Sequence, residues 1–253
     1  VARLSTMGEM AAGIAHEIRN PLGSIGLYAR LLDEDLAELP DSRETALKIG
    51  RAVRGLEAIV QDVLSFAGGL RIKPAELRAG DLFDATLEAI GPSATQHVAI
   101  KRAGVDQPVH GDWGLLKQAL VNLVKNAVDA MAESDCDEPS ITLAARATKA
   151  GRVVLRVRDS GPGIAPEALD RMFNPFYTTR ASGTGLGLAI VHRILDAHGG
   201  SVRAQNNRNS PGATVELRLP PVPAAGPTDT HTDPTSPRQA ATPARDIEQE
   251  QAA

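Results

Sequence analysis

Two series of regularly spaced apolar residues at the start of the sequence constrain the fold more than any other feature. Apolar side chains recur every three or four positions over residues 4–39 and again over residues 46–67. This spacing places them along one face of an α-helix, near the heptad period. We therefore expect two long amphipathic helices within residues 1–70.

Short breaker segments mark the ends of these helices. Pro21 lies inside the first series and is expected to bend its helix, because proline removes one backbone hydrogen bond. Pro40 ends the first helix, and Asp41 with Glu44 three residues later predicts a capping box that starts the second. The resulting hairpin buries little by itself. Two copies would form a four-helix bundle, so the sequence predicts a homodimer.

His16 is the residue in this hairpin whose position suggests chemistry. Helical geometry places it about 200° from Ile14, away from the apolar stripe. A neutral imidazole is a nucleophile when its other nitrogen is held by an acceptor, and the neighbouring Glu17 can supply one. A lone exposed histidine is otherwise an ordinary surface residue.

Residues 71–219 contain both strand-like and helix-like patterns. Strands are expected at 98–102, 141–147, 152–159, 200–206 and 213–219, with helices at 81–90, 112–131 and 186–198. The order does not alternate strictly, so we expect an α+β fold with a mixed sheet covered by helices on one face. Residues 220–253 are rich in proline, threonine and alanine, which predicts a disordered tail.

Charge and cysteine content exclude several kinds of function. The formal net charge is −4, which argues against nucleic-acid binding by bulk electrostatics. The single cysteine cannot form an internal disulfide, and no stretch of about 18 apolar residues predicts a membrane span. We expect a cytoplasmic protein whose only membrane link would be a sensor region preceding Val1, absent from this chain.

Three clusters in the second part of the chain carry chemically suggestive residues. Asn122 and Asn126 are four residues apart, and therefore on one side of a helix; amide oxygens are suitable ligands for Mg²⁺. Asp159 ends an apolar strand face, where a carboxylate needs a donor; it is either a cap or turn aspartate or an acceptor for the amino group of adenine. The glycine-rich segment 183–188 leads into a helix, whose N-terminal amides favour anions.

Five short motifs together resemble the transmitter of a two-component sensor histidine kinase. In chain order they are AHEIRNPL at 15–22 (H box), NLVKNA at 122–127 (N box), DSGPGI at 159–164 (G1 box), FNPF at 173–176 (F box) and GTGLGL at 183–188 (G2 box). The resemblance covers residues 1–219. It implies a dimerisation and phosphotransfer hairpin at 1–70 and an ATP-binding sandwich of the Bergerat type at 71–219.

The resemblance also implies roles for individual residues. His16 would accept the phosphoryl group with Glu17 as general base, and Asn20 would orient water for dephosphorylating the regulator. The cofactors would be ATP and Mg²⁺, with Asn126 as the metal ligand, and the partner would be a response-regulator receiver domain. The residues expected to bind ATP are Asn122, Lys125, Asn126, Asp159, Gly161, Gly163, Phe176, Thr179, Arg180, Gly183, Thr184, Gly185, Leu186 and Gly187.

Two segments of the chain depart from the family pattern. Val128, Asp129 and Ala130 follow the N-box alanine, where many members have Lys-Tyr or Lys-His, and Arg180 stands where lysine is frequent. Two other functions are left open. One is an ATPase of the same fold that phosphorylates nothing, and the other is a dimeric signalling scaffold with an inactive nucleotide site.

Overall fold

The structure, a computed structural model, describes most of the chain. The described ranges are 2–36, 39–68, 70–134, 136–180 and 183–221, with side chains left undescribed at 2–17, 19, 40, 58 and 67. The chain divides into two units, residues 1–222 and 223–253. The second unit, which holds nearly all of the predicted tail, lies outside the described residues.

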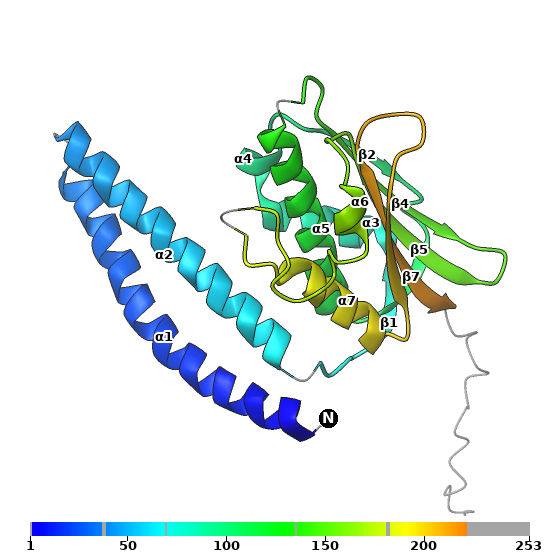
Figure 1. Ribbon diagram of the computed structural model, residues 1–253, viewed down its shortest axis with the longest axis horizontal. Helices are drawn as coiled ribbons and strands as arrows, with labels where there is room; N and C mark the ends of the chain where they lie inside the picture. Colours follow the sequence, from blue (N-terminus) through cyan, green and yellow to red (C-terminus); the bar gives the residue numbers. More distant parts are fainter. Residues whose placement is uncertain (1, 37–38, 69, 135, 181–182, 222–253) are drawn as a thin grey trace, which may run out of the picture. The chain divides into compact units, whose positions relative to one another are not determined.

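The first seventy residues form the expected pair of helices. Helix α1 spans Ala2–Asp35 and helix α2 spans Pro40–Ala67 (Figure 1). Helix α1 continues through Pro21 and follows a curved path in Figure 1. An ion pair between Arg43 Nε and Asp33 Oδ1, 2.7 Å apart, joins the two helices close to the turn.

The predicted capping box at the start of α2 is wrong. Leu39 occupies the N-cap position, and its side chain makes no capping hydrogen bond. Pro40 is instead the first helical residue, where its missing N–H leaves no donor unsatisfied and its fixed φ suits the helix. Asp41 is therefore inside the helix, and its carbonyl accepts a hydrogen bond from the Thr45 hydroxyl.

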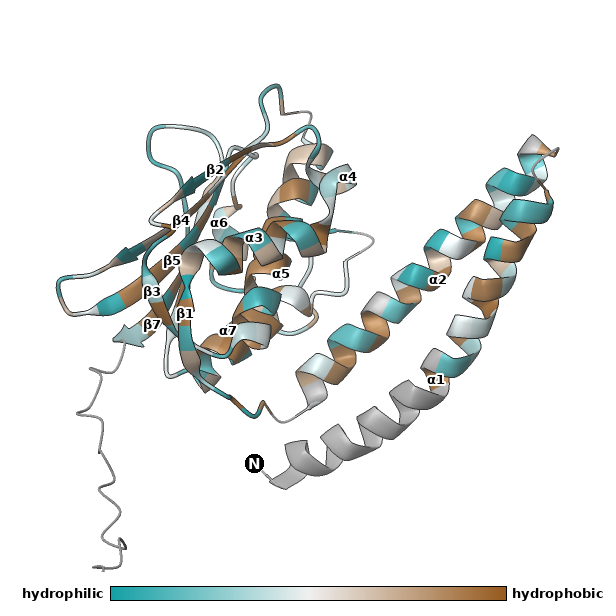
Figure 2. Ribbon diagram, turned by 180° about the vertical axis from the view of Figure 1, so that it is seen from behind, coloured by the Kyte–Doolittle hydropathy of each residue, from teal (hydrophilic) through white to brown (hydrophobic). Residues whose placement is uncertain are grey.

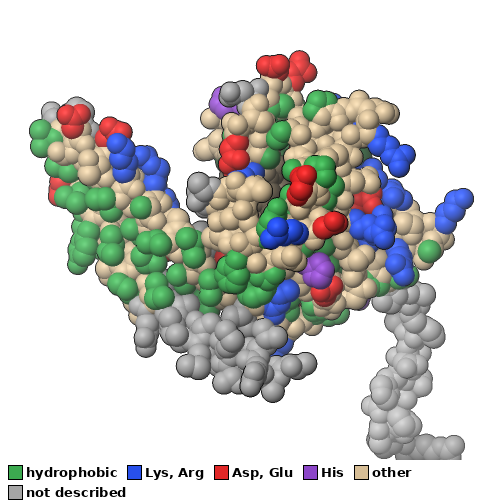
Figure 3. Space-filling view, viewed as in Figure 1, with side chains coloured by type: hydrophobic (Ala, Val, Ile, Leu, Met, Phe, Trp, Pro, Cys, Tyr) green, Lys and Arg blue, Asp and Glu red, His purple; other side chains and the backbone are tan. Residues whose placement is uncertain are grey.

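The apolar stripes of the hairpin are only partly covered. Small and medium residues fill the contact between the helices; they are Leu22, Ala29, Ala46 and Val53. Other members of the same stripes stay exposed, including Ile25 and Leu32 on α1 and Leu56 on α2. Figure 2 shows apolar and polar positions alternating along α2, and in Figure 3 hydrophobic side chains cover much of the visible hairpin surface.

The α/β domain is built on a five-stranded sheet. Its strands lie in the order β2 (Ala99–Ala103), β4 (Ser140–Ala147), β5 (Arg152–Asp159), β7 (Ala213–Pro221) and β6 (Ser201–Asn206). Strands β2 and β4 are parallel and the other neighbouring pairs are antiparallel. This arrangement confirms the predicted mixed sheet.

Helices cover one face of this sheet. They are α3 (Ala79–Ile90), α5 (Trp113–Glu133) and α7 (Gly187–Ala197), which Figure 1 shows on the same side of the strands. Alternate strand residues such as Leu143, Leu155 and Leu217 point toward the helices and are fully buried. Among the described residues, no helix packs on the opposite face of the sheet.

Several short elements were not expected from the sequence. Strands β1 (Ala75–Arg78) and β3 (Pro108–Gly111) form a separate antiparallel pair. Helices α4 (Pro92–Thr95) and α6 (Pro166–Leu169) are single turns that begin at a proline. No helix within the described ranges is both long and apolar enough to cross a membrane.

Candidate active site

Helix α5 presents the two N-box asparagines. It begins after Asp112, which is its N-cap: the Asp112 Oδ1 accepts a hydrogen bond from the Leu115 amide at 3.0 Å. Buried apolar residues fix the orientation of this helix toward the sheet; they are Leu116, Ala119, Leu120, Leu123, Val124, Ala127 and Met131. Asn122 and Asn126 are partly exposed on the neighbouring side.

The two asparagines differ in what they contact. Asn122 Nδ2 donates to the Gly187 carbonyl at 3.1 Å, and this bond ties α5 to the start of α7. The side chain of Asn126 has no hydrogen bond to any described residue, so its amide is available to a ligand. A single amide oxygen can contribute one ligand to Mg²⁺, which normally retains waters and shares phosphate oxygens. The described residues contain no cluster of three or more His, Cys, Asp or Glu side chains suited to holding a metal without phosphate.

Asp159 lies at the end of β5 and is held by backbone donors. Its Oδ1 accepts hydrogen bonds from the amides of Gly161, at 2.9 Å, and Ala213, at 3.1 Å. Its Oδ2 has no partner among the described residues. Asn207 Nδ2 also donates to the Asp159 carbonyl at 2.9 Å. The carboxylate is thus oriented with one oxygen available to a donor such as an exocyclic amine.

The loop after Asp159 needs its glycines for different reasons. A Cβ at Gly161 would lie 3.1 Å from Asp159 Oδ1 and 3.3 Å from Met131 Cγ, which is closer than most such contacts. Gly163 has φ of +87°, in the region that favours glycine. The next residue, Ile164, makes two hydrogen bonds with the Asn206 side chain: the Ile164 amide donates to Asn206 Oδ1, and Asn206 Nδ2 donates to the Ile164 carbonyl. Sequence reasoning missed Asn206 and Asn207, because nothing in the local sequence links residues 206 and 207 to a loop more than forty residues earlier.

The segment between the G1 and G2 motifs contains a strained backbone position. Phe176 has φ of +62° and is 69% exposed, so it is not core packing. Its amide donates to the carbonyl of Gly185, which itself has φ of +67°. A Cβ at Gly185 would lie 2.5 Å from the Phe176 carbonyl carbon, so only glycine fits this approach. Thr179 is exposed, and the intervening residues 181 and 182 lie outside the described ranges.

The remaining G2 residues have distinct environments. Thr184 Oγ1 lies 3.1 Å from Asp62 Oδ2 on α2 and accepts a hydrogen bond from the Leu186 amide. Burial raises the pKa of Asp62, and this effect outweighs the Thr184 hydrogen bond and the charge of Lys125. The side chain of Leu186 is buried in the core, so only its backbone remains for a ligand. Gly183 packs against Thr178, and Gly187 begins α7.

Arg180 is held by α5. Its guanidinium donates to the Asn126 carbonyl at 2.9 Å and pairs with Asp129 at 3.1 Å and with Glu133 at 3.3 Å. Burial raises the pKa of Asp129, with Arg180 opposing this shift and Glu133 adding to it. The two departures from the family pattern therefore meet in one ion pair, with the Arg180 side chain only 21% exposed.

The predicted phosphoacceptor residues lie on α1. The backbone at His16 and Glu17 is helical, but both side chains lie outside the described residues. Asn20 is exposed one turn later, and its carbonyl accepts a hydrogen bond from the Ser24 hydroxyl. Within the α/β domain, the structure brings the N-box helix α5 next to both glycine motifs: Asn122 bonds to Gly187 of the G2 box, and Gly161 of the G1 box lies beside Met131.

Two family models match the chain. Residues 6–68 match the His Kinase A (phospho-acceptor) domain, and residues 111–223 match the family described as histidine kinase-, DNA gyrase B-, and HSP90-like ATPase. The sensor histidine kinase ZraS of Salmonella typhi is 33% identical over 221 residues, which cover 86% of this chain and 46% of the relative. The signal transduction histidine-protein kinase AtoS of Escherichia coli K12 is 32% identical, covering 86% and 35%.

Solved structures give the same result. Full-length ShkA in complex with AMPPNP aligns with a TM-score of 0.70 and 31% identity, over 85% of this chain and 46% of that one. ThkA in complex with the response regulator protein TrrA aligns with a TM-score of 0.60 and 28% identity, over 88% and 64%. The chain belongs to the two-component sensor histidine kinases and contains the transmitter region of that family. It spans about half the length of the ZraS relatives that it matches.

Proposed function

We propose that this chain phosphorylates His16 with ATP and passes the phosphoryl group to an aspartate of a response-regulator receiver domain. One observation carries the proposal: a phospho-acceptor domain and an ATPase domain of the histidine kinase type occur in one chain, at residues 6–68 and 111–223. The division that follows is a phosphotransfer hairpin at 1–70, a catalytic domain at 71–219 and a tail at 220–253.

ATP would bind against α5 and the two glycine segments. The free Oδ2 of Asp159 is suited to the amino group of adenine, and Gly161 permits close approach of the backbone. At the other end, Gly185 and the start of α7 offer backbone amides to the phosphates. The related kinase ShkA was solved with AMPPNP, an analogue of ATP, which supports this assignment.

Magnesium would be shared between Asn126 and the phosphates. The unpaired amide of Asn126 would supply one ligand to the ion, and phosphate and water would supply the others. When bound, the ion would neutralise charge that develops on the transferred group. Lys125, exposed on the adjacent position of α5, adds positive charge to the same region.

The transfer step requires mainly positioning. An imidazole nitrogen of His16 attacks the γ-phosphorus, the bond to the bridging oxygen breaks, and ADP leaves. Glu17 accepts the imidazole proton as the new P–N bond forms. The phosphohistidine then donates its group to the receiver aspartate. ThkA was solved in complex with a response regulator, which supports a partner of this class.

Two further features belong to the same proposal. Asn20, exposed one turn after His16, would orient water for dephosphorylating the regulator, which gives a second, phosphatase activity. The uncovered stripe of the hairpin would pair with a second copy, as a four-helix bundle. Exposed Ile25, Leu32 and Leu56 support this assembly, because a monomer leaves them in water.

Labelling with γ-³²P-ATP and magnesium tests the kinase. We expect an acid-labile, base-stable label on the wild-type protein and none on His16→Ala, while His16→Ala still binds ATP. ATP hydrolysis by both proteins without label would favour the non-phosphorylating ATPase. Failure of the wild type to bind ATP with magnesium would favour the inactive scaffold.

The phosphatase is tested separately with His16→Gln, which cannot be phosphorylated but keeps Asn20. It should accelerate loss of phosphate from the phosphorylated cognate regulator, whereas His16→Gln combined with Asn20→Ala should not. Equal rates with and without either protein would remove this second activity.

A further inference from the structure

The face of the sheet that the helices leave uncovered carries six basic side chains and one acidic side chain in its paired rows. In strand register, three rows cross this face: Lys101, Thr142, Arg158, Thr214 and Gln205; Ala103, Ala144, Arg156, Glu216 and Arg203; and Arg146, Val154, Arg218 and Ser201. Glu216 is the only acid in these rows. A chain whose formal net charge is −4 therefore concentrates positive charge on one face. In Figure 3 basic side chains lie along the sheet side of the domain.

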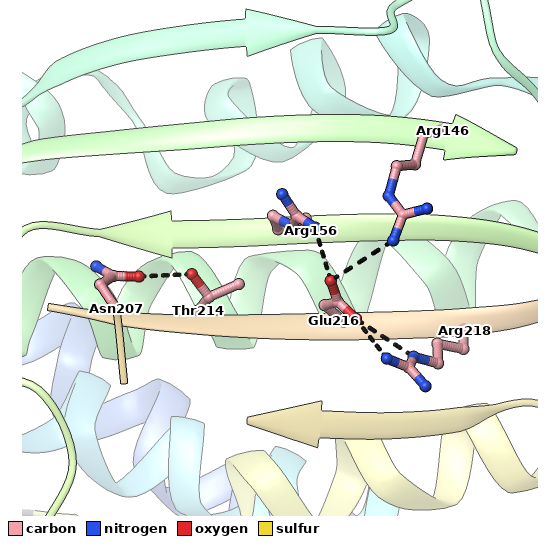
Figure 4. Close-up of polar contacts among 6 residues, drawn as sticks. All are labelled: Arg146, Arg156, Asn207, Thr214, Glu216 and Arg218. Carbon is pink, nitrogen blue, oxygen red and sulfur yellow. Dashed lines mark hydrogen bonds and ion pairs between the residues drawn. The ribbon is translucent and has the colours of Figure 1, made fainter. Parts of the chain in front are cut away.

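Glu216 neutralises only part of this charge. It is 6% exposed and binds Arg156 and Arg218, both at 2.8 Å, with Arg146 at 4.0 Å (Figure 4). Arg158 and Arg203 have no acidic partner among the described residues. The Nε atom of Arg156 is buried without a hydrogen-bond partner, so an arginine that is ion-paired with Glu216 still retains an unused donor.

A hollow opens at one end of this face, beside the turn between β6 and β7. Its volume is about 200 Å³. It is lined by three arginines, Arg156, Arg158 and Arg208, by four amide side chains and by the hydroxyl of Thr214. The lining includes no acidic and no large apolar side chain. Arg208 is exposed and forms no hydrogen bond or ion pair with a described residue.

The turn that forms this hollow is fixed before any ligand arrives. Asn207 donates to the carbonyls of Asp159 and Pro211, at 2.9 and 2.8 Å, and accepts from Thr214 at 2.7 Å. Arg158 Nη2 donates to Ser210 Oγ at 2.7 Å. Because the turn is already ordered, a ligand would bind without first ordering a loop.

We propose that this hollow, the arginine cradle of Arg156, Arg158 and Arg208, binds the phosphate group of a small soluble molecule. Guanidinium groups match phosphate oxygens in geometry and charge, and neighbouring amide and hydroxyl groups add neutral donors. An apolar ligand is disfavoured by a polar lining that holds no large apolar side chain. The cradle lies on the outer face of the sheet, whereas the predicted nucleotide-binding residues of α5 and the start of α7 lie on its helical side.

Calorimetric titration of the full chain with inorganic pyrophosphate tests this site. We expect saturable binding that Arg208→Gln and Arg158→Gln each weaken by about tenfold, the effect of losing one charge-assisted contact. Arg203→Gln is the matched control, since it removes the same charge from the same face but does not line the hollow. It should change the affinity by less than about twofold.

A second variant separates the cradle from the proposed nucleotide site. Asn126→Ala should retain the pyrophosphate binding that Arg208→Gln weakens, even if it loses ATP. Three results would overturn the proposal: no saturable binding to the wild type, equal losses in Arg203→Gln and Arg208→Gln, or complete loss in Asn126→Ala. Sedimentation of the protein with phosphatidylglycerol vesicles tests whether the basic face binds lipid headgroups instead. Binding to vesicles without binding to pyrophosphate would indicate a membrane-facing charge and also overturn it.

Discussion

Removing the charge of Glu216 should destabilise the α/β domain in a way that depends on pH. The Glu216 side chain is buried and lies between Arg156 and Arg218, each 2.8 Å away. Burial alone would raise the pKa of Glu216, but hydrogen bonds from Arg218 and Arg156 and their charges outweigh it. The pKa therefore lies below the ordinary value of 4.5. In Glu216→Gln the arginines remain on the sheet without their common counterion.

The size of the effect follows from these contacts. A hydrogen bond to a charged group contributes about 1.5–3 kcal/mol, but both arginines are about one third exposed, which weakens each. We expect Glu216→Gln to lower the free energy of unfolding at pH 7 by about 2 kcal/mol, or roughly 4–8 °C in melting temperature. Since the folded state lowers the pKa, this stabilisation is present above pH 4.5 and is lost as pH falls through the folded-state value.

Fluorescence of the single tryptophan, Trp113 at the start of α5, reports unfolding of this domain. Thermal melts of the wild type and Glu216→Gln should differ at pH 7 and converge in acid. Exposed Glu76→Gln serves as a control and should melt within about 0.5 kcal/mol of the wild type at every pH. Equal stability of Glu216→Gln and wild type at pH 7, or a difference that does not change with pH, would refute the reasoning.

Three other outcomes are expected. Gly185→Ala should weaken ATP binding by at least about tenfold in calorimetry, because Gly185 has φ of +67° and a Cβ there would meet the Phe176 backbone. Gly187→Ala should fold normally, because the atom nearest to its Cβ is 3.9 Å away. Similar stability without ligand and similar ATP affinity for the two variants would contradict this expectation. Asp112→Ala should cost about 1–2 kcal/mol in urea unfolding, as expected for a lost N-cap that also binds the Lys73 amide; no change would show that water replaces it. If the proposed homodimer forms, the wild type should sediment as a dimer and Leu56→Asp as a monomer in analytical ultracentrifugation; a Leu56→Asp dimer would argue against pairing through the exposed stripe.

Local patterns were enough to predict the main elements. The period of three and four gave both hairpin helices, and alternating apolar residues gave the strands β4 and β5 close to their observed bounds. Strands β1 and β3 were missed because each is only four residues long and their pairing joins segments about thirty residues apart. The start of α2 was misassigned because Pro40 both ends one pattern and begins the next helix.

The predicted site residues were found through motifs, while their supporting contacts depend on the fold. Asn207 reaches the Asp159 carbonyl only because β7 pairs with β5 and β6 pairs with β7. The Arg180–Asp129 ion pair joins positions 51 residues apart, which neither local sequence reveals. The basic face likewise exists only once the strand order is known, since its arginines come from four different strands.

Locating the phosphoryl group by tandem mass spectrometry, after the intact chain is mixed with ATP and magnesium at neutral pH, tests the central proposal most directly. The proposal predicts phosphate on His16 and on no other histidine, with the group moving to an aspartate when the cognate receiver domain is added. ADP production with His16 unmodified throughout the reaction would contradict it.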